Sequence, residues 1–150
     1  MPVRIRPCEP RDLPAVVELM RQLSEAASAA SDFDMDLVQT IDADMARYPA
    51  IYLNLVGEEA GAVVGFLSLI FYKTFFHRGG TALINELVVD RAHRNVGIGS
   101  ALIDAAVREA RARGMDEIEV GTERENEGAQ RFYHRHGLEE EYVLLGMEFD

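Results

Sequence analysis

Hydrophobic and polar positions in the first third of the chain predict one strand followed by two helices. Val3 and Ile5 alternate with arginines, which is typical of a short strand. Apolar residues then recur at helical spacing in two stretches that end before Pro49. These positions are Leu13, Val16, Val17, Met20 and Leu23, then Leu37, Val38, Ile41 and Met45. The small and polar segment Ser24 to Asp34 predicts a mobile connection between the two helices.

The middle of the chain predicts three strands joined by two hairpins. Ile51–Val56 and Ala62–Tyr72 have strand composition and are joined through Gly57–Gly61, an acidic turn with glycine at both ends. A second hairpin through His77–Gly80 leads to a strand at Ala82–Asp90. The apolar run in that last segment is typical of a buried central strand.

The last third predicts a helix, a strand, a helix and a final strand. Helical periodicity runs from Ile98 to Arg113, and Gly114 stands at the expected C-terminal stop. Alternation predicts a short strand at Ile118 and Val120 and a last strand at Tyr142–Phe149. Between them, one face of a helix carries Ala129, Phe132, Tyr133 and His136. The whole order predicts an α+β fold over residues 1–150, as a single domain.

Composition narrows the classes of protein to which the chain could belong. At 150 residues and 48% hydrophobic content, the chain is sized for one domain with a real core. The net charge of −11 argues against nucleic-acid binding and mildly favours a cationic substrate, although an acidic surface also simply maintains solubility. One cysteine, Cys8, excludes an intramolecular disulfide and fits a reducing cytoplasm. We find no signal-like leader and no apolar run near the roughly 20 residues of a membrane span, so we expect a cytoplasmic protein with no membrane partner.

The run Arg94-Asn95-Val96-Gly97-Ile98-Gly99 lies between a predicted strand and a predicted helix. The first N–H groups of a helix have no acceptor within it and can bind an anion, and glycine lets the backbone approach phosphate closely. A dinucleotide fingerprint would need a third glycine where Leu102 stands, and a P-loop would need a lysine after Gly99, where Ser100 follows. The remaining pattern, Arg-x-x-Gly-x-Gly after a strand, predicts a diphosphate cradle.

This loop resembles the pyrophosphate loop of the GNAT (Gcn5-related) N-acetyltransferases. The segment Asn126–Leu138 likewise resembles the family's N-x-x-A-x-x-F-Y-x-x-x-G-F/L motif, and the order of elements is similar over nearly the whole chain. The resemblance implies a three-layer arrangement, with a central mixed, mostly antiparallel sheet flanked by helices. It also implies acetyl-coenzyme A as co-substrate and direct acetyl transfer to a primary amine in a ternary complex.

The same resemblance implies which residues bind the coenzyme. A bulge in the strand before the loop would free the backbone of Leu87, Val88 and Val89 to bond the pantetheine arm; the alternative is an ordinary paired core strand. Asn126 would contact the pantetheine or pyrophosphate region, or else act only as a helix N-cap. The diphosphate would lie against the loop and the first helical turn, namely Arg94, Asn95, Val96, Gly97, Ile98, Gly99 and Ser100.

Two residues are candidates for proton transfer. Glu86 lies within an apolar run, where a charge is costly unless it is paired, solvated or used, and it is the candidate general base, acting directly or through water. By strand alternation Glu86 could instead face solvent, with Asn85 pointing inward. The resemblance implies that the hydroxyl of Tyr133 points at the coenzyme A sulfur as general acid; the alternative is a core aromatic.

Cys8, two histidines and an aromatic stretch are further residues with chemical potential. Cys8 lies between two prolines and far in sequence from the other candidates, so covalent catalysis is not favoured. His134 and His136 are two residues apart on a helix and do not share a face, and we predict no metal site. The aromatic stretch Phe71–Phe76 could line an acceptor pocket, pack in a dimer or be buried, and it receives no role.

The acceptor is left open by the sequence. Small-molecule and protein amines both remain candidates, and an exposed final strand could pair with another chain to give a homodimer. The alternative to an enzyme is a non-catalytic domain that binds an acyl-coenzyme A as a sensor or assembly module. The presence of both Glu86 and Tyr133 counts against that alternative.

Overall fold

A mixed five-stranded sheet forms the centre of the computed structural model, which describes residues 2–26, 34–94 and 96–149. The first four strands are antiparallel neighbours in chain order, and the fifth runs parallel to the fourth. They are β1 (Arg4–Pro7), β2 (Tyr52–Glu59), β3 (Ala62–Tyr72), β4 (Thr81–Val89) and β5 (Glu117–Val120). The predicted mixed, mostly antiparallel sheet is thereby confirmed.

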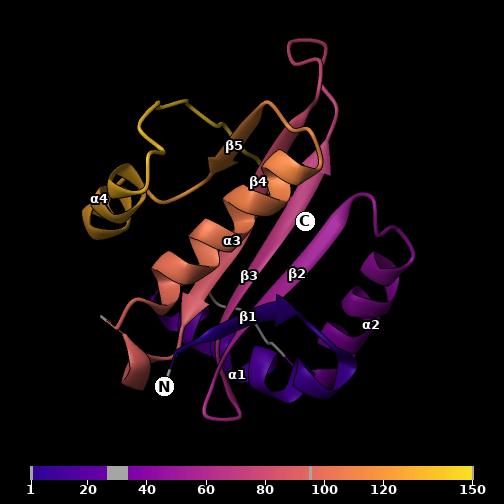
Figure 1. Ribbon diagram of the computed structural model, residues 1–150, viewed down its shortest axis with the longest axis vertical. Helices are drawn as coiled ribbons and strands as arrows, with labels where there is room; N and C mark the ends of the chain where they lie inside the picture. The colour runs from indigo at the N-terminus through magenta and orange to yellow at the C-terminus, as the bar shows by residue number, and fades with distance from the viewer. Residues whose placement is uncertain (1, 27–33, 95, 150) are drawn as a thin grey trace.

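Helices cover both faces of this sheet (Figure 1). One face carries α1 (Leu13–Ala26) and α2 (Met35–Ala46), and the other carries α3 (Ile98–Ala112), which makes the crossover from β4 to β5. The fourth helix, α4 (Glu127–Arg135), lies at the end of the molecule away from α2 (Figure 1). The predicted three-layer α+β arrangement is therefore confirmed.

The core consists of two apolar layers separated by the sheet. Alternate residues of β3 point to opposite faces, so Leu67 and Leu69 pack under α3, whereas Phe66 packs under α1. Val16 and Leu19 complete the α1 layer, and Ile98, Leu102, Ile103 and Ala106 fill the α3 layer. Burial on both faces explains why β3 is apolar over most of its length.

A buried ion pair attaches β1 to the start of α1. The Arg6 guanidinium donates two hydrogen bonds to the Asp12 carboxylate, at 2.7 and 2.9 Å, and a third to Glu58 at 3.0 Å. Both Arg6 and Asp12 are buried. The hydrogen bonds from Arg6 lower the pKa of Asp12.

The predicted final strand at Tyr142–Phe149 is wrong: this segment belongs to no strand of the structure. Its apolar side chains are exposed, with Leu144 at 92% and Phe149 at 91%. Alternation shows only that a segment is able to form a strand, whereas a strand also needs a partner edge. The Tyr142 hydroxyl donates a hydrogen bond to the carboxylate of Glu117 at 3.2 Å, a contact between side chains that does not pair the backbone of this segment with β5.

The helix and strand boundaries otherwise differ from the predicted ones by a few residues. β2 continues to Glu59, so the first hairpin turn is reduced to Ala60 and Gly61, both at positive φ. In the connection predicted at Ser24 to Asp34, the first three residues belong to α1 and Asp34 caps α2; residues 27–33 lie outside the described part. Among the described helices, none is long and apolar enough to cross a membrane.

Candidate active site

β4 contains a bulge at Asn85. In the register with β3, Ser68 faces Glu86 and Leu69 faces Ile84, so Asn85 is the extra residue. Such an insertion interrupts the ladder and bends the strand. The bulge lies in the strand where we predicted one, and the alternative of a regularly paired strand is wrong at this position.

β4 is also longer than its neighbour β5. Their parallel pairing begins at Thr81 and Glu117 and ends at Ile84 and Val120, whereas β4 continues to Val89. The stretch from the bulge to Val89 therefore extends past the end of β5. Along that stretch, the described part of the chain pairs with β4 on the β3 side alone, so the opposite edge can receive an extended ligand. Leu87, Val88 and Val89 lie on this edge.

The glycine loop, residues 94–99, lies between β4 and α3 and runs into the first turn of α3. Gly97 is the N-cap with a φ of 87°, and no side chain caps the helix there. The first turn carries no acidic residue, so its free N–H groups and the helix dipole favour an anion. Exposed Arg94 donates from Nε to the Val89 carbonyl at 3.2 Å, which ties the loop to the end of β4. Asn95 lies outside the described residues.

α4 is attached to the first turn of α3. A Cβ atom at Gly99 would lie 3.3 Å from the ring of Phe132, and Ser100 Oγ is 3.0 Å from Nε2 of His136. Gly99 therefore has a packing role as well as its predicted place in the cradle. The contact with Phe132 sets the position of the next residue, Tyr133.

Tyr133 packs against the core layer under α3, as do Leu87 and Val89. Its ring meets that of Phe132 edge-on, with 5.4 Å between the centroids. Burial raises the pKa of its phenol, so the hydroxyl stays protonated and can donate. The alternative reading as a core aromatic is thus half correct, because the ring is packed while the hydroxyl makes no hydrogen bond within the described residues.

Glu86 is half-buried on the α1 face of the sheet, opposite to the face on which Tyr133 packs. The buried hydroxyl of Ser68 donates a hydrogen bond to its carboxylate. The neighbouring Asn85 is the exposed residue, so the alternative in which Asn85 points inward is wrong. Glu86 and Tyr133, the two proton-transfer candidates, therefore lie on opposite faces of the sheet. Glu86 belongs to β4 and Tyr133 to α4.

Asn126 caps α4, since its Oδ1 accepts a hydrogen bond from the N–H of Ala129 at 3.0 Å. The N-cap reading is therefore correct as geometry, and a contact with the coenzyme stays a prediction.

A clasp between α1 and the start of the glycine loop is a feature that sequence reasoning missed. Gln22 donates to Asp90 at 2.8 Å and accepts from the N–H of Arg91 at 2.9 Å. His93 bonds the same carboxylate. These hydrogen bonds, that from Gln22 foremost, lower the pKa of Asp90. The residues come from distant parts of the chain, so no local pattern indicates the clasp.

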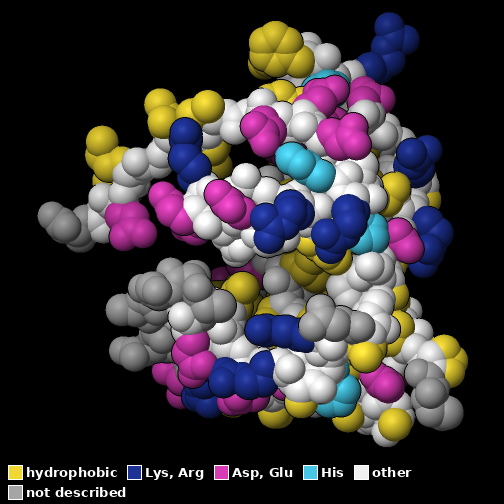
Figure 2. Space-filling model, turned by 90° about the vertical axis from the view of Figure 1, so that its left-hand side faces the viewer, with side chains coloured by type: hydrophobic (Ala, Val, Ile, Leu, Met, Phe, Trp, Pro, Cys, Tyr) yellow, Lys and Arg dark blue, Asp and Glu magenta, His cyan; other side chains and the backbone are white. Residues whose placement is uncertain are grey.

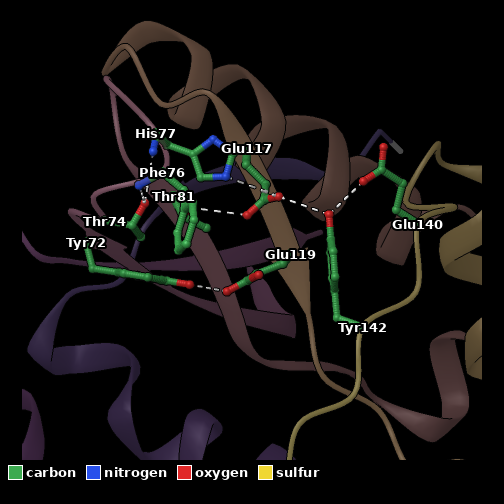
Figure 3. A pocket seen from close by; sticks show the side chains of 9 residues that line it. All are labelled: Tyr72, Thr74, Phe76, His77, Thr81, Glu117, Glu119, Glu140 and Tyr142. Atoms are coloured by element: carbon green, nitrogen blue, oxygen red, sulfur yellow. Dashed lines mark hydrogen bonds and ion pairs between the residues drawn. The ribbon is translucent and has the colours of Figure 1, made fainter.

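A cavity of about 450 Å3 opens on the sheet beside β5 (Figure 3). Glu117 accepts hydrogen bonds from Thr81 at 3.4 Å and from Tyr142 at 3.2 Å, and Tyr72 donates to Glu119. Burial, together with the bond to Glu119, raises the pKa of Tyr72 to about 12. The lining residues are Tyr72, Thr74, Phe76, His77, Thr81, Glu117, Glu119, Glu140 and Tyr142.

The residues of the aromatic stretch Phe71–Phe76, to which we assigned no role, differ in whether they are buried, line this cavity or are exposed. Phe71 is buried, with Arg113 stacked 4.2 Å from its centroid, whereas Tyr72 and Phe76 line the cavity and Phe75 is fully exposed. The acidic lining was missed, although the alternation Glu117-Ile118-Glu119-Val120 could have indicated two carboxylates on one face of a strand.

The Cys8 thiol is not activated as a nucleophile. Burial raises the pKa of the Cys8 thiol to about 12, which suppresses the thiolate that a nucleophile needs. Within residues 2–26, 34–94 and 96–149, no group of three or more His, Cys, Asp or Glu side chains is placed to hold a metal ion.

A family model described as "Acetyltransferase (GNAT) family" matches residues 15–138, which include the glycine loop, the bulge and Tyr133. The chain belongs to the GNAT family. It is therefore an acyltransferase, and the family implies acetyl-coenzyme A as the co-substrate. The matched region ends just before the exposed C-terminal segment.

Several relatives of this GNAT protein are named N-acetyltransferases. Glucosamine 6-phosphate N-acetyltransferase 1 of Oryza sativa subsp. japonica is 28% identical over 97% of this chain and 87% of its own length. Glucosamine 6-phosphate N-acetyltransferase of Trypanosoma brucei brucei is 30% identical, over 91% and 88%. An uncharacterised N-acetyltransferase of Methanocaldococcus jannaschii is 38% identical over 61% of this chain, but the match spans only 41% of that longer protein.

Solved structures share the fold over the full chain. A protein of Bacillus halodurans C-125, titled a transcriptional regulator, has a TM-score of 0.85 at 23% identity and covers 99% of this chain and 100% of its own. Glucosamine-6-phosphate N-acetyltransferase of Arabidopsis thaliana has a TM-score of 0.83 at 20% identity, with both chains fully covered. At these identities the likeness concerns the fold alone.

Proposed function

We propose that the protein is an acetyl-coenzyme A-dependent N-acetyltransferase that moves the acetyl group directly to a primary amine in a ternary complex. The observation that carries this proposal is the opening of β4 from β5 beyond Ile84, which leads straight to the glycine loop. The pantetheine arm would bond the backbone of Leu87, Val88 and Val89. The diphosphate would meet the N–H groups at Val96–Ser100, with Arg94 and Asn95 beside it and Asn126 near the arm.

The chemistry needs a neutral amine, a polarised carbonyl and a proton for the leaving thiolate. Glu86 takes the proton from the ammonium of the acceptor, directly or through water, and Ser68 holds its carboxylate in position. A backbone N–H near Leu87 or Val88 polarises the thioester carbonyl. As the C–N bond forms and the C–S bond breaks, Tyr133 donates its proton to the sulfur. Residues 1–150 would act as one domain in the cytoplasm, where acetyl-coenzyme A is available.

We further propose that the acceptor is cationic. Three carboxylates, from Glu117, Glu119 and Glu140, line the cavity beside β5, and His77 is the sole basic side chain among the lining residues. Such a lining repels phosphate and attracts ammonium groups, and the aromatic walls add cation–π attraction. Several relatives are named for acceptors that carry phosphate or phosphonate, so a different acceptor is expected here.

The distance between Glu86 and the acidic cavity beside β5 favours an extended diamine or polyamine as the acceptor. Tyr72 lies four residues beyond Ser68 on the same face of β3, which corresponds to roughly 13 Å along the strand. An acceptor of that length would place its reacting amine at Glu86 and a second ammonium in the cavity.

An acceptor screen at saturating acetyl-coenzyme A, which follows release of free thiol, tests these proposals. Diamines of increasing length, matched monoamines, glucosamine and glucosamine 6-phosphate form the panel. We expect the longer diamines to have the lowest KM, and Glu119→Gln to raise that KM without affecting the monoamines. Preference for glucosamine 6-phosphate would overturn the cationic acceptor. Tight donor binding with no turnover on any amine would favour a non-catalytic acyl-coenzyme A-binding domain.

A further inference from the structure

His136, at the end of α4, is a polar residue that the proposed mechanism does not use. It is the C-cap of that helix and is half-buried, and its ring packs against Phe132 with 4.8 Å between the centroids. Its Nε2 atom lies 3.0 Å from the hydroxyl oxygen of Ser100. Ser100 belongs to the first turn of α3, so His136 reaches the turn against which the diphosphate would lie.

The hydroxyl of Ser100 can serve an anion in only one arrangement of this hydrogen bond. A hydroxyl has one proton to donate and two lone pairs that accept. If Nε2 of His136 carries a proton, the ring donates to the Ser100 oxygen, and the Ser100 O–H is free for a further acceptor. If Nε2 carries none, the O–H is used on the ring, and the remaining lone pairs repel phosphate oxygens. Within the described part of the chain, the Ser100 hydroxyl has no other hydrogen-bond partner.

The surroundings of this contact favour an anion, although the chain as a whole has a net charge of −11. The first turn of α3 has no acidic residue and no side-chain cap, so its N–H groups are available. α4 carries Arg131 and Arg135 in addition to its C-cap His136. Figure 2 views the molecule from the side of α4, and Lys, Arg and His side chains lie together near the middle of that face. The basic side chains of α4 therefore add to the attraction of the α3 turn for an anion.

We propose that His136 is a positioning residue of the donor site, which orients the Ser100 hydroxyl toward the diphosphate of acetyl-coenzyme A. Nε2 of His136 donates to the Ser100 oxygen, and the Ser100 O–H donates to a diphosphate oxygen. This inference rests on the proposed binding of the donor at the glycine loop. A hydrogen bond from a hydroxyl to an anion is stronger than one between neutral groups, so a hydroxyl held in this direction raises the affinity for the donor.

Calorimetry of coenzyme A binding tests the role of His136 without any turnover. His136→Leu removes the donor to Ser100 and should raise the dissociation constant about 10-fold. His136→Gln, whose amide N–H can take the place of Nε2–H, should restore most of the affinity. His134→Leu is the matched control, because this exposed histidine of the same helix contacts Glu141 instead, and it should bind as wild type does. A wild-type dissociation constant in His136→Leu would overturn the inference.

Ser100→Ala shows whether His136 acts through the hydroxyl. If it does, the double variant with His136→Leu should bind coenzyme A no more weakly than Ser100→Ala alone, because the two losses are then one and the same. A further loss of about 10-fold in the double variant would mean that His136 acts independently of Ser100, and would reject the positioning role.

A truncated donor distinguishes this role from one in which His136 only attaches α4, and with it Tyr133, to α3. S-acetyl-N-acetylcysteamine is an acetyl thioester without the diphosphate. The preference for acetyl-coenzyme A over this thioester, as a ratio of kcat/KM values, should fall about 10-fold in His136→Leu. An unchanged ratio would assign His136 to packing and overturn the inference.

The outcome in wild type separates this inference from the function on which it rests. Absence of coenzyme A binding by wild type would reject the proposed function, and the role of His136 with it. Tight binding by wild type that His136→Leu leaves unchanged would reject the role of His136 alone.

Discussion

At the scale of single residues, the position of Glu86 beside a buried hydroxyl leads to a sharp prediction. Glu86→Gln keeps the size of the side chain and its hydrogen bond with Ser68 but cannot take a proton from the amine. We expect kcat/KM to fall about 100-fold at neutral pH, as for the loss of a general base. Activity should recover as the pH approaches the acceptor's own pKa, because the neutral amine then forms without help.

Steady-state kinetics across pH checks this prediction. Glu59→Gln, at the far end of β2, is the matched control and should behave as wild type. A Glu86→Gln enzyme with wild-type rates at neutral pH would exclude Glu86 as the base.

Tyr133 leads to a second prediction, because its ring packs in the core while its hydroxyl is available. Tyr133→Phe keeps the ring and should lower kcat about 100-fold while the donor's dissociation constant stays near that of wild type. Burial raises the pKa of Tyr133 above the ordinary tyrosine value of about 10. The wild-type rate should therefore persist at least up to about pH 10. Single-turnover rates and calorimetry of donor binding measure the two effects, with Tyr48→Phe as control. Unchanged turnover would remove Tyr133 from the mechanism.

The residues of the site divide by how local their signal is. The glycine loop and the segment Asn126–Leu138 are continuous in sequence, so their pattern indicates a function before any fold is known. The cavity beside β5 instead joins Tyr72, Glu119 and Tyr142 from three separate parts of the chain. The register of β3, β4 and β5 creates that grouping, and no sequence window contains it.

At the scale of elements, the N-terminus of α3 depends on the conformation of Gly97. Its φ of 87° is strained for a residue with a Cβ, yet an added Cβ would meet no atom within 4 Å. Gly97→Ala should therefore lower the free energy of unfolding by about 1 kcal/mol through the backbone alone. Gly97→Asn should cost less, because asparagine adopts positive φ more readily. Urea unfolding measures both, and an Ala variant as stable as wild type would show that this conformation carries no cost.

Element prediction succeeded where periodicity and burial agree. The helices α1 and α3 each bury the face that their apolar spacing defines, and the apolar strand β3 is buried on both faces. The predicted final strand is absent from the structure, although Val143, Leu145, Met147 and Phe149 alternate in the sequence. Pairing is a non-local property, and among the described residues no strand pairs with residues 142–149, although β5 leaves one edge open. The sequence therefore identified a segment able to form a strand but not its partner.

At the scale of the whole molecule, two opposing electrostatic effects set the dependence of stability on pH. The net charge of −11 at pH 7 makes the folded chain repel itself, and this repulsion weakens as carboxylates protonate. Asp12 and Asp90 act in the other direction, because hydrogen bonds from Arg6 and Gln22 respectively hold their pKa values below the usual range. A carboxyl with a lowered folded pKa stabilises the fold above its unfolded pKa of about 3.9 and loses that contribution as the pH falls through the folded value.

We therefore expect the free energy of unfolding to rise from pH 7 toward about pH 5 and to fall steeply below about pH 4. Asp12→Asn should lower the stability at pH 7 by about 3 kcal/mol, since it leaves the buried Arg6 with Glu58 as its remaining carboxylate partner. The same variant should also lose part of the steep acid limb, because its side chain no longer titrates. Urea unfolding across this pH range measures both effects, with Asp36→Asn in the first turn of α2 as the matched control. An acid limb equally steep in Asp12→Asn and wild type would assign the acid sensitivity to other carboxylates, and would reduce the Arg6–Asp12 pair to a contact that matters for packing alone.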